Sequence, residues 1–119
     1  MTTGEVKRLI LRDVKGWRGV FGLDEWTLHL RYDRLDDEMV ASCMALWQYR
    51  EATLTFDLEQ IVDRELGRGA IRKTVLHELL HVVCCGYQRH HKREQLEAMV
   101  TDLERIVEHC WKAPQPKDS

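Results

Sequence analysis

The sequence predicts an α+β domain: an N-terminal helix, a small and mostly antiparallel sheet of three strands, and further helices after the sheet. Two periodicities predict this class. Near both ends of the chain, apolar residues recur every three or four positions, which is the spacing of one face of an α-helix. In short segments between residues 26 and 56 the pattern changes to that of strands. A length of 119 residues fits one domain, expected over 1–112 and followed by a disordered tail at 113–119.

The first half of the chain should form one helix and three strands. Residues 4–21 have helical spacing, and Gly22 follows where a left-handed residue commonly ends a helix. Residues 26–32 alternate between apolar and polar, which predicts a half-buried strand. The segments 39–47 and 52–56 are apolar or rich in β-formers and are separated by a short polar break, which predicts a hairpin.

The second half should be helical. Asp57 suits the N-cap of a short helix that runs to Leu66 and ends in the glycines that follow. A second helix is expected from about Ala70 to Cys85, with Gly86 as its stop. After a basic turn at 90–93, a last helix is expected over 94–111. It should bury one apolar stripe: Leu96, Val100, Leu103, Val107 and Cys110.

Composition and charge exclude several classes of partner. A net charge of −2 gives no basic surface, so a nucleic-acid partner is not favoured. No apolar run reaches the length of a membrane span and the first residues lack a signal-peptide pattern, so we expect a cytoplasmic protein without a membrane partner. Cys43, Cys84, Cys85 and Cys110 lack the spacing of a disulfide framework and should be reduced core residues. No feature of the sequence sets an oligomeric state.

The segment from His77 to His81 has the pattern His-Glu-x-x-His inside an apolar helical run. Two histidines four positions apart lie one turn apart on the same helix face, where both can bind one zinc ion. Glu78 lies about 100° further round the helix, from where its carboxylate can reach a metal-bound water without being a ligand. The alternative is an accidental match in a His-rich helix. The apolar flanks favour a buried zinc-binding helix with Glu78 as general base.

A catalytic zinc takes three protein ligands and leaves the fourth position to water, so a third ligand must come from elsewhere. On the last helix, Glu97 falls about 120° from the centre of the apolar stripe, whereas Glu94 points nearly opposite to it. Glu97 is therefore the expected ligand. Glu94, and His90 or His91 in the basic turn, remain alternatives. Tyr87, His90 and His91 are also candidates for a group that stabilises the transition state.

With a glutamate ligand on the next helix, the motif resembles the gluzincin-type zinc metallopeptidases, most closely their compact single-domain forms from phages and prophages. The resemblance covers Ala41 to about Ile106, and Glu97 followed by alanine matches its ligand helix. It implies a zincin-like fold, one zinc ion per chain, and a peptide or unfolded protein segment as substrate, bound along residues 41–47. Many gluzincins have an aspartate four residues after the ligand glutamate; here that position is Thr101, with Asp102 next to it.

We therefore expect zinc-dependent hydrolysis of peptide bonds, with Glu78 as general base. Two alternatives belong to other classes. One is a zinc-containing regulatory or binding module without peptidase activity. The other is a metal-dependent nuclease, because Gly86, Tyr87 and His90 partly match the three-histidine motif of certain RNA hydrolases, although at a different spacing.

Overall fold

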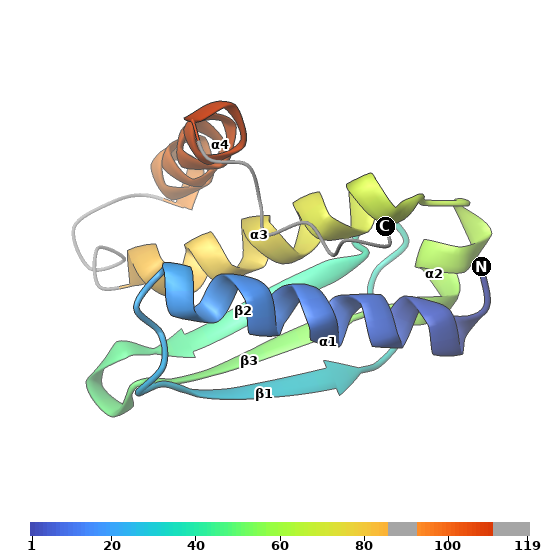
Figure 1. Cartoon of the computed structure of the whole chain (residues 1–119), viewed down its shortest axis with the longest axis horizontal. Helices are drawn as coiled ribbons and strands as arrows, with labels where there is room; N and C mark the ends of the chain where they lie inside the picture. The colour runs from blue at the N-terminus through green and yellow to red at the C-terminus, as the bar shows by residue number, and fades with distance from the viewer. Residues whose placement is uncertain (86–92, 111–119) are drawn as a thin grey trace.

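A computed structural model of the chain describes residues 1–85 and 93–110. In these residues four α-helices and three strands follow one another, which confirms the α+β class (Figure 1). The elements, in chain order, are α1 (Thr3–Val20), β1 (Thr27–Tyr32), β2 (Ala41–Leu46), a 3-10 turn (Trp47–Tyr49), β3 (Glu51–Phe56), α2 (Leu58–Asp63), α3 (Arg68–Cys84) and α4 (Arg93–Cys110).

The sheet has the strand order β1-β3-β2 and is mixed, which corrects the expected mostly antiparallel arrangement. β2 and β3 form the predicted antiparallel hairpin, with Cys43 opposite Leu54. β1 pairs with β3 in parallel, with Leu30 opposite Leu54. The central position of β3 has a physical reason. Its residues Ala52, Leu54 and Phe56 are all buried, so this strand is stabilised most by having a neighbour on each side.

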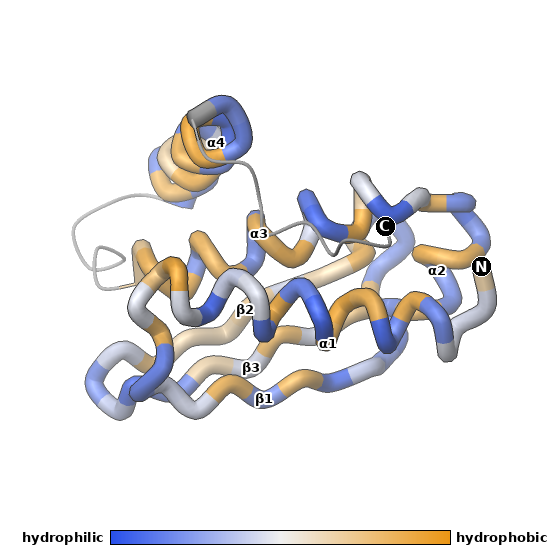
Figure 2. Tube along the Cα trace, viewed as in Figure 1, coloured by the Kyte–Doolittle hydropathy of each residue, from blue (hydrophilic) through white to orange (hydrophobic). Residues whose placement is uncertain are grey.

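Helices cover one face of the sheet. α1 and α3 lie side by side across it, and α4 lies on the far side of α3 from α1 (Figure 1). Apolar residues recur along both covering helices and along the strands beneath them (Figure 2). α1 contributes Val6, Ile10, Val14 and Trp17 to the shared core. This helix ends as predicted, because Gly22 has the positive φ of 68° that a left-handed residue after a helix adopts.

α2 is shorter than predicted and α3 is longer. Asp57 caps α2 as expected, accepting a hydrogen bond of 3.1 Å from the amide of Gln60, but the helix ends at Asp63 instead of Leu66. Gly67 does not end a helix; it is the N-cap of α3, which begins at Arg68. α3 is buried on most of its surface because α1, β2 and α4 all contact it. It provides the core with these residues: Ile71, Val75, Leu76, Leu79, Leu80, Val82 and Cys84.

α4 is less buried than its sequence predicted. It contacts α3, and of the expected stripe Val100 is buried, while Leu96, Leu103 and Val107 are only half-buried. The side chain of Cys110 lies outside the described residues, as do Gly86, the turn at 90–92, Trp111 and the tail. Among the described residues, Cys43, Cys84 and Cys85 form no disulfide bond, in line with the reduced state expected from the sequence. No helix among the described residues is long and apolar enough to cross a membrane.

Candidate metal centre

The two motif histidines lie on the side of α3 that faces α4. Their rings are 5.0 Å apart between centroids and meet edge to face, as side chains one helical turn apart do. Both rings are only partly exposed, because α3 is held between the sheet and the other helices. The buried helix therefore presents two imidazoles at the border of the core.

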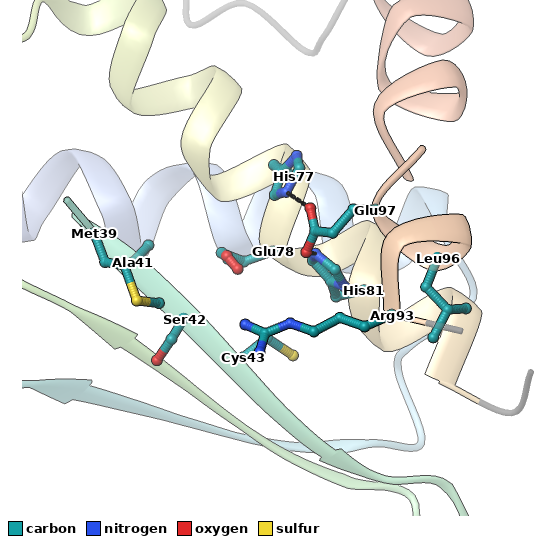
Figure 3. Close-up of a pocket in the computed structure, with 10 residues that line it drawn as sticks. All are labelled: Met39, Ala41, Ser42, Cys43, His77, Glu78, His81, Arg93, Leu96 and Glu97. Atoms are coloured by element: carbon teal, nitrogen blue, oxygen red, sulfur yellow. Dashed lines mark ion pairs between the residues drawn. The ribbon is translucent and has the colours of Figure 1, made fainter. Parts of the chain in front are cut away.

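Glu97 reaches both histidines from α4 (Figure 3). Its Oε1 lies 3.0 Å from Nε2 of His81, and its Oε2 lies 3.4 Å from Nε2 of His77. One ligand atom from each of the three residues can be chosen so that all lie within 4.8 Å of one another. Glu94, the alternative carboxylate, is exposed and is not part of this group. The structure thus brings together the three residues that the sequence favoured.

The spacing of these atoms fits a tetrahedral zinc ion. Zinc binds imidazole nitrogen and carboxylate oxygen at about 2.0 to 2.2 Å, so two ligands at a tetrahedral angle lie about 3.3 to 3.6 Å apart. The separations of 3.0 and 3.4 Å, one from each oxygen of Glu97 to a histidine nitrogen, are close to this range. Two imidazoles and one carboxylate also form a donor set that zinc accepts, with one position left for water. The residues present therefore fit the ion.

Glu104 supports the group from behind and was not expected from the sequence. Nδ1 of His77 lies 2.8 Å from Oε2 of Glu104, whose side chain is only 12% exposed. With the ring proton on Nδ1, His77 donates to Glu104 and keeps the Nε2 lone pair free for a metal. Thr101 and Asp102, the two residues that the sequence offered near this position, are exposed.

Spacing along α4 is the signal that could have identified Glu104. Arg93, Glu97, Val100 and Glu104 follow one another at intervals of four, three and four, so they share one face of the helix. Val100 is the fully buried member, and the other three carry charge. The helical-wheel analysis of the sequence placed the centre of the buried face among the apolar residues alone. Because α4 packs mainly on α3, its contact face is narrower and includes charged residues.

Glu78 lies beside the histidines and points into the same cleft (Figure 3). Its side chain is 5% exposed. Burial raises the pKa of this carboxyl to about 7, and the nearby carboxylates of Glu97 and Glu104 act in the same direction, whereas His77 opposes them. A cation held by the three ligands would favour the ionised form. Glu78 is thus a carboxyl able to take up and release a proton near neutral pH.

The cleft in front of these residues has a volume of about 490 Å³. One wall is formed by Met39, two residues before β2, and by the first residues of that strand: Ala41, Ser42 and Cys43. The other wall carries the motif residues and α4, including Arg93, which the sequence analysis did not single out. A second hollow of about 570 Å³ shares Met39, Ala41, His77, Glu78 and Glu97 with the cleft but not His81, and it extends toward the start of α3. The candidate metal position thus lies in the first cleft, and the second hollow continues from it along β2.

The thiols near the cleft do not add to the donor set. Burial raises the pKa of Cys43 to about 12, with the charges of Glu78 and Cys85 acting in the same direction. Burial also raises the pKa of Cys84. Both thiols are therefore protonated at neutral pH in the metal-free protein, and among the described residues neither belongs to the group whose possible ligand atoms lie within 4.8 Å of one another.

Among the described strands, β2 lies at the edge of the sheet, and the side that has no strand partner there borders the cleft. The amide of Asp57 donates to the carbonyl of Val40 at 2.9 Å, so Val40 and every second residue after it turn their backbone groups toward β3. Ala41, Cys43 and Ala45 consequently turn their N–H and C=O groups toward the free edge. An extended peptide in the cleft could form strand hydrogen bonds with them.

Tyr87, His90 and His91, the other candidates for ligands or transition-state groups, lie outside the described residues.

Comparisons with protein families, curated proteins and solved structures return no match to this chain. The site is therefore interpreted from its geometry.

Proposed function

We propose that the protein hydrolyses peptide bonds in extended or unfolded protein segments, with one zinc ion per chain bound by His77, His81 and Glu97. The observation that carries this proposal is the position of a buried carboxyl, Glu78, beside a zinc-compatible donor set. Both lie in a cleft whose opposite wall is an unpaired strand edge. The likeness of the motif to compact gluzincins agrees with this proposal.

A zinc ion held there would polarise a substrate carbonyl and make water a stronger nucleophile near neutral pH. Glu78 takes the proton that the attacking water loses: its carboxyl lies beside the metal-binding residues, and the charge of an ion held there would favour its ionised form. It then passes this proton to the nitrogen of the leaving amine as the C–N bond breaks. The net reaction consumes one water and yields a carboxylic acid and an amine. Glu104 holds the ring of His77 in position throughout.

The strand edge defines the class of substrate. Backbone groups of Ala41 and Cys43 can bind any extended peptide, whatever its side chains. A folded domain has most of its backbone hydrogen bonds satisfied internally, so it is a poor partner for this edge. We therefore propose unfolded or loop segments as substrates. Phosphodiester substrates are disfavoured, because a chain with a net charge of −2 offers no basic surface for the phosphates of a nucleic acid.

The substitution Glu78→Gln tests catalysis separately from metal binding. Glutamine keeps the shape and hydrogen-bonding capacity of the side chain but cannot accept the proton. We expect zinc content and the melting temperature of the zinc-loaded protein to change little. Hydrolysis of an unstructured protein substrate should fall by roughly 10²- to 10⁴-fold, the usual contribution of a positioned general base.

The matched control is Glu94→Gln, which makes the same chemical change at an exposed position on α4. It should leave zinc content and hydrolysis at the level of the unmodified protein. If Glu78→Gln hydrolyses the substrate as fast as the unmodified protein does, Glu78 is not the general base. If the zinc-loaded protein cleaves no unstructured substrate, the protein is a zinc-containing binding module and the peptidase proposal is wrong.

A further inference from the structure

The cleft contains one permanently cationic side chain among its described lining residues. Arg93 begins α4, and its side chain extends across the cleft toward Ser42 and Cys43 of β2 (Figure 3). The glutamates Glu97 and Glu104 are paired with histidines, and within the described chain Arg93 has no carboxylate partner. A guanidinium in this position is available to a ligand.

Arg93 also lies close to the metal-binding group. It lines the same cleft as His77, His81 and Glu97, the three residues of that group. Arg93 and Glu97 are four residues apart, so both project from one face of α4 toward α3. The guanidinium therefore lies next to the proposed reaction centre, on the side nearer to Cys43.

The direction of β2 shows which part of a bound peptide would meet this guanidinium. The start of β2 lines a hollow together with Ala70 and Thr74, near the start of α3, whereas Cys43 shares a cleft with His81, one turn after the middle of the helix. β2 and α3 thus run in the same direction. A peptide paired antiparallel to β2, the commoner strand arrangement, has its N-terminal part near Cys43 and its C-terminal part near Ala41.

We propose that Arg93 is a specificity-determining residue that selects substrates with an aspartate or glutamate on the N-terminal side of the cleaved bond. This inference rests on the proposed peptidase function and deepens it. A guanidinium matches the planar, two-oxygen geometry of a carboxylate and forms charge-assisted hydrogen bonds with it. Because Arg93 is partly open to solvent, the preference is moderate, about tenfold over a neutral residue, and it weakens as the salt concentration rises.

Cleavage-site mapping tests the proposal. The zinc-loaded protein is incubated with a library of synthetic peptides of randomised sequence, and the cleaved bonds are identified by mass spectrometry. We expect acidic residues to be enriched at one or two positions N-terminal to the cleaved bond. Arg93→Glu should reverse this preference toward lysine and arginine. Arg105→Glu is the matched control, because it makes the same charge change on an exposed part of α4 away from the cleft and should keep the acidic preference.

A binding measurement keeps the test independent of turnover. Two peptides that differ only in glutamate or glutamine at the preferred position are titrated into zinc-loaded Glu78→Gln protein. The glutamate peptide should bind about tenfold more tightly, and adding Arg93→Glu should invert the order. Equal affinities, or a preference that survives Arg93→Glu in a folded variant, would overturn the role of Arg93.

The two proposals fail in different ways. If the protein cleaves peptides without an acidic preference, only the inference about Arg93 is wrong. An acidic preference C-terminal to the cleaved bond would overturn the antiparallel placement and therefore the side assigned to Arg93. If the protein cleaves nothing, the peptidase function is wrong, and the specificity inference is overturned with it.

Discussion

The contact between His77 and Glu104 leads to a quantitative prediction about zinc affinity. Glu104→Ala removes the carboxylate that lies 2.8 Å from Nδ1 of His77, at a position where the glutamate is only 12% exposed. The imidazole then loses the hydrogen-bond acceptor that fixes its orientation. The same acceptor makes Nε2 a stronger ligand for the metal, and this effect is lost as well. A hydrogen bond to a charged, largely buried group contributes about 1.5 to 3 kcal/mol, and this corresponds to a factor of about 10 to 100 in affinity. The same range is typical when a residue supporting a zinc ligand is lost.

The assay is a zinc competition titration against a chromogenic chelator at neutral pH. Glu108→Ala is the matched control one turn further along α4. Glu108 lies 3.8 Å from Lys73 in an exposed pair that contributes little, so its loss should leave zinc affinity unchanged. Circular dichroism of both variants checks that α4 still forms. An unchanged affinity in Glu104→Ala, or an equal loss in Glu108→Ala, would refute the supporting role of Glu104.

Three further predictions follow from the same geometry. Glu97→Ala should lower zinc affinity at least about tenfold, whereas Glu94→Ala should leave it unchanged. The reverse order in the same titration would show that Glu94, and not Glu97, is the zinc ligand. Removing zinc with a chelator should lower the melting temperature by several degrees, because the ligands come from two helices that the ion holds together; an unchanged melting curve after verified metal loss would contradict this. In the metal-free protein the raised pKa of Glu78, about 7, means that the folded state retains a proton that the unfolded state releases above about pH 4.5. Stability should therefore fall by up to about 3 kcal/mol between pH 4.5 and 7 from this group, and metal-free Glu78→Gln should lack this part of the pH dependence in urea unfolding.

Local patterns were sufficient for the elements and for the motif. Helical spacing located α1, α3 and α4 to within a few residues, because an amphipathic helix repeats its apolar residues over several turns. Gly22 and Asp57 marked ends of helices through chemistry that involves only neighbouring residues. The relation between His77, Glu78 and His81 is equally local, since four residues on one helix have a fixed geometry.

Relations between elements were only partly predictable. The central place of β3 and its parallel pairing with β1 depend on which strands become neighbours in the folded chain. The alternation of apolar and polar residues within one strand does not specify its neighbours. The wheel for α4 favoured Glu97 but missed Glu104 and Arg93, because it assumed that the buried face is the apolar face. In the structure the face is set by contact with α3, and two of its charged residues, Glu97 and Glu104, are paired with histidines of that helix.

The sequence by itself therefore determined the class of the fold, the helix that carries two imidazoles and a carboxylate, and the preferred third residue of the group. Only the tertiary structure decided which carboxylate supports His77, which strand edge faces the cleft, and that Arg93 lies within it. The physical reason is the range of the interactions. Helix periodicity and capping arise between residues a few positions apart, whereas a site shared by α3, α4 and β2 exists only after the core has fixed how these elements pack.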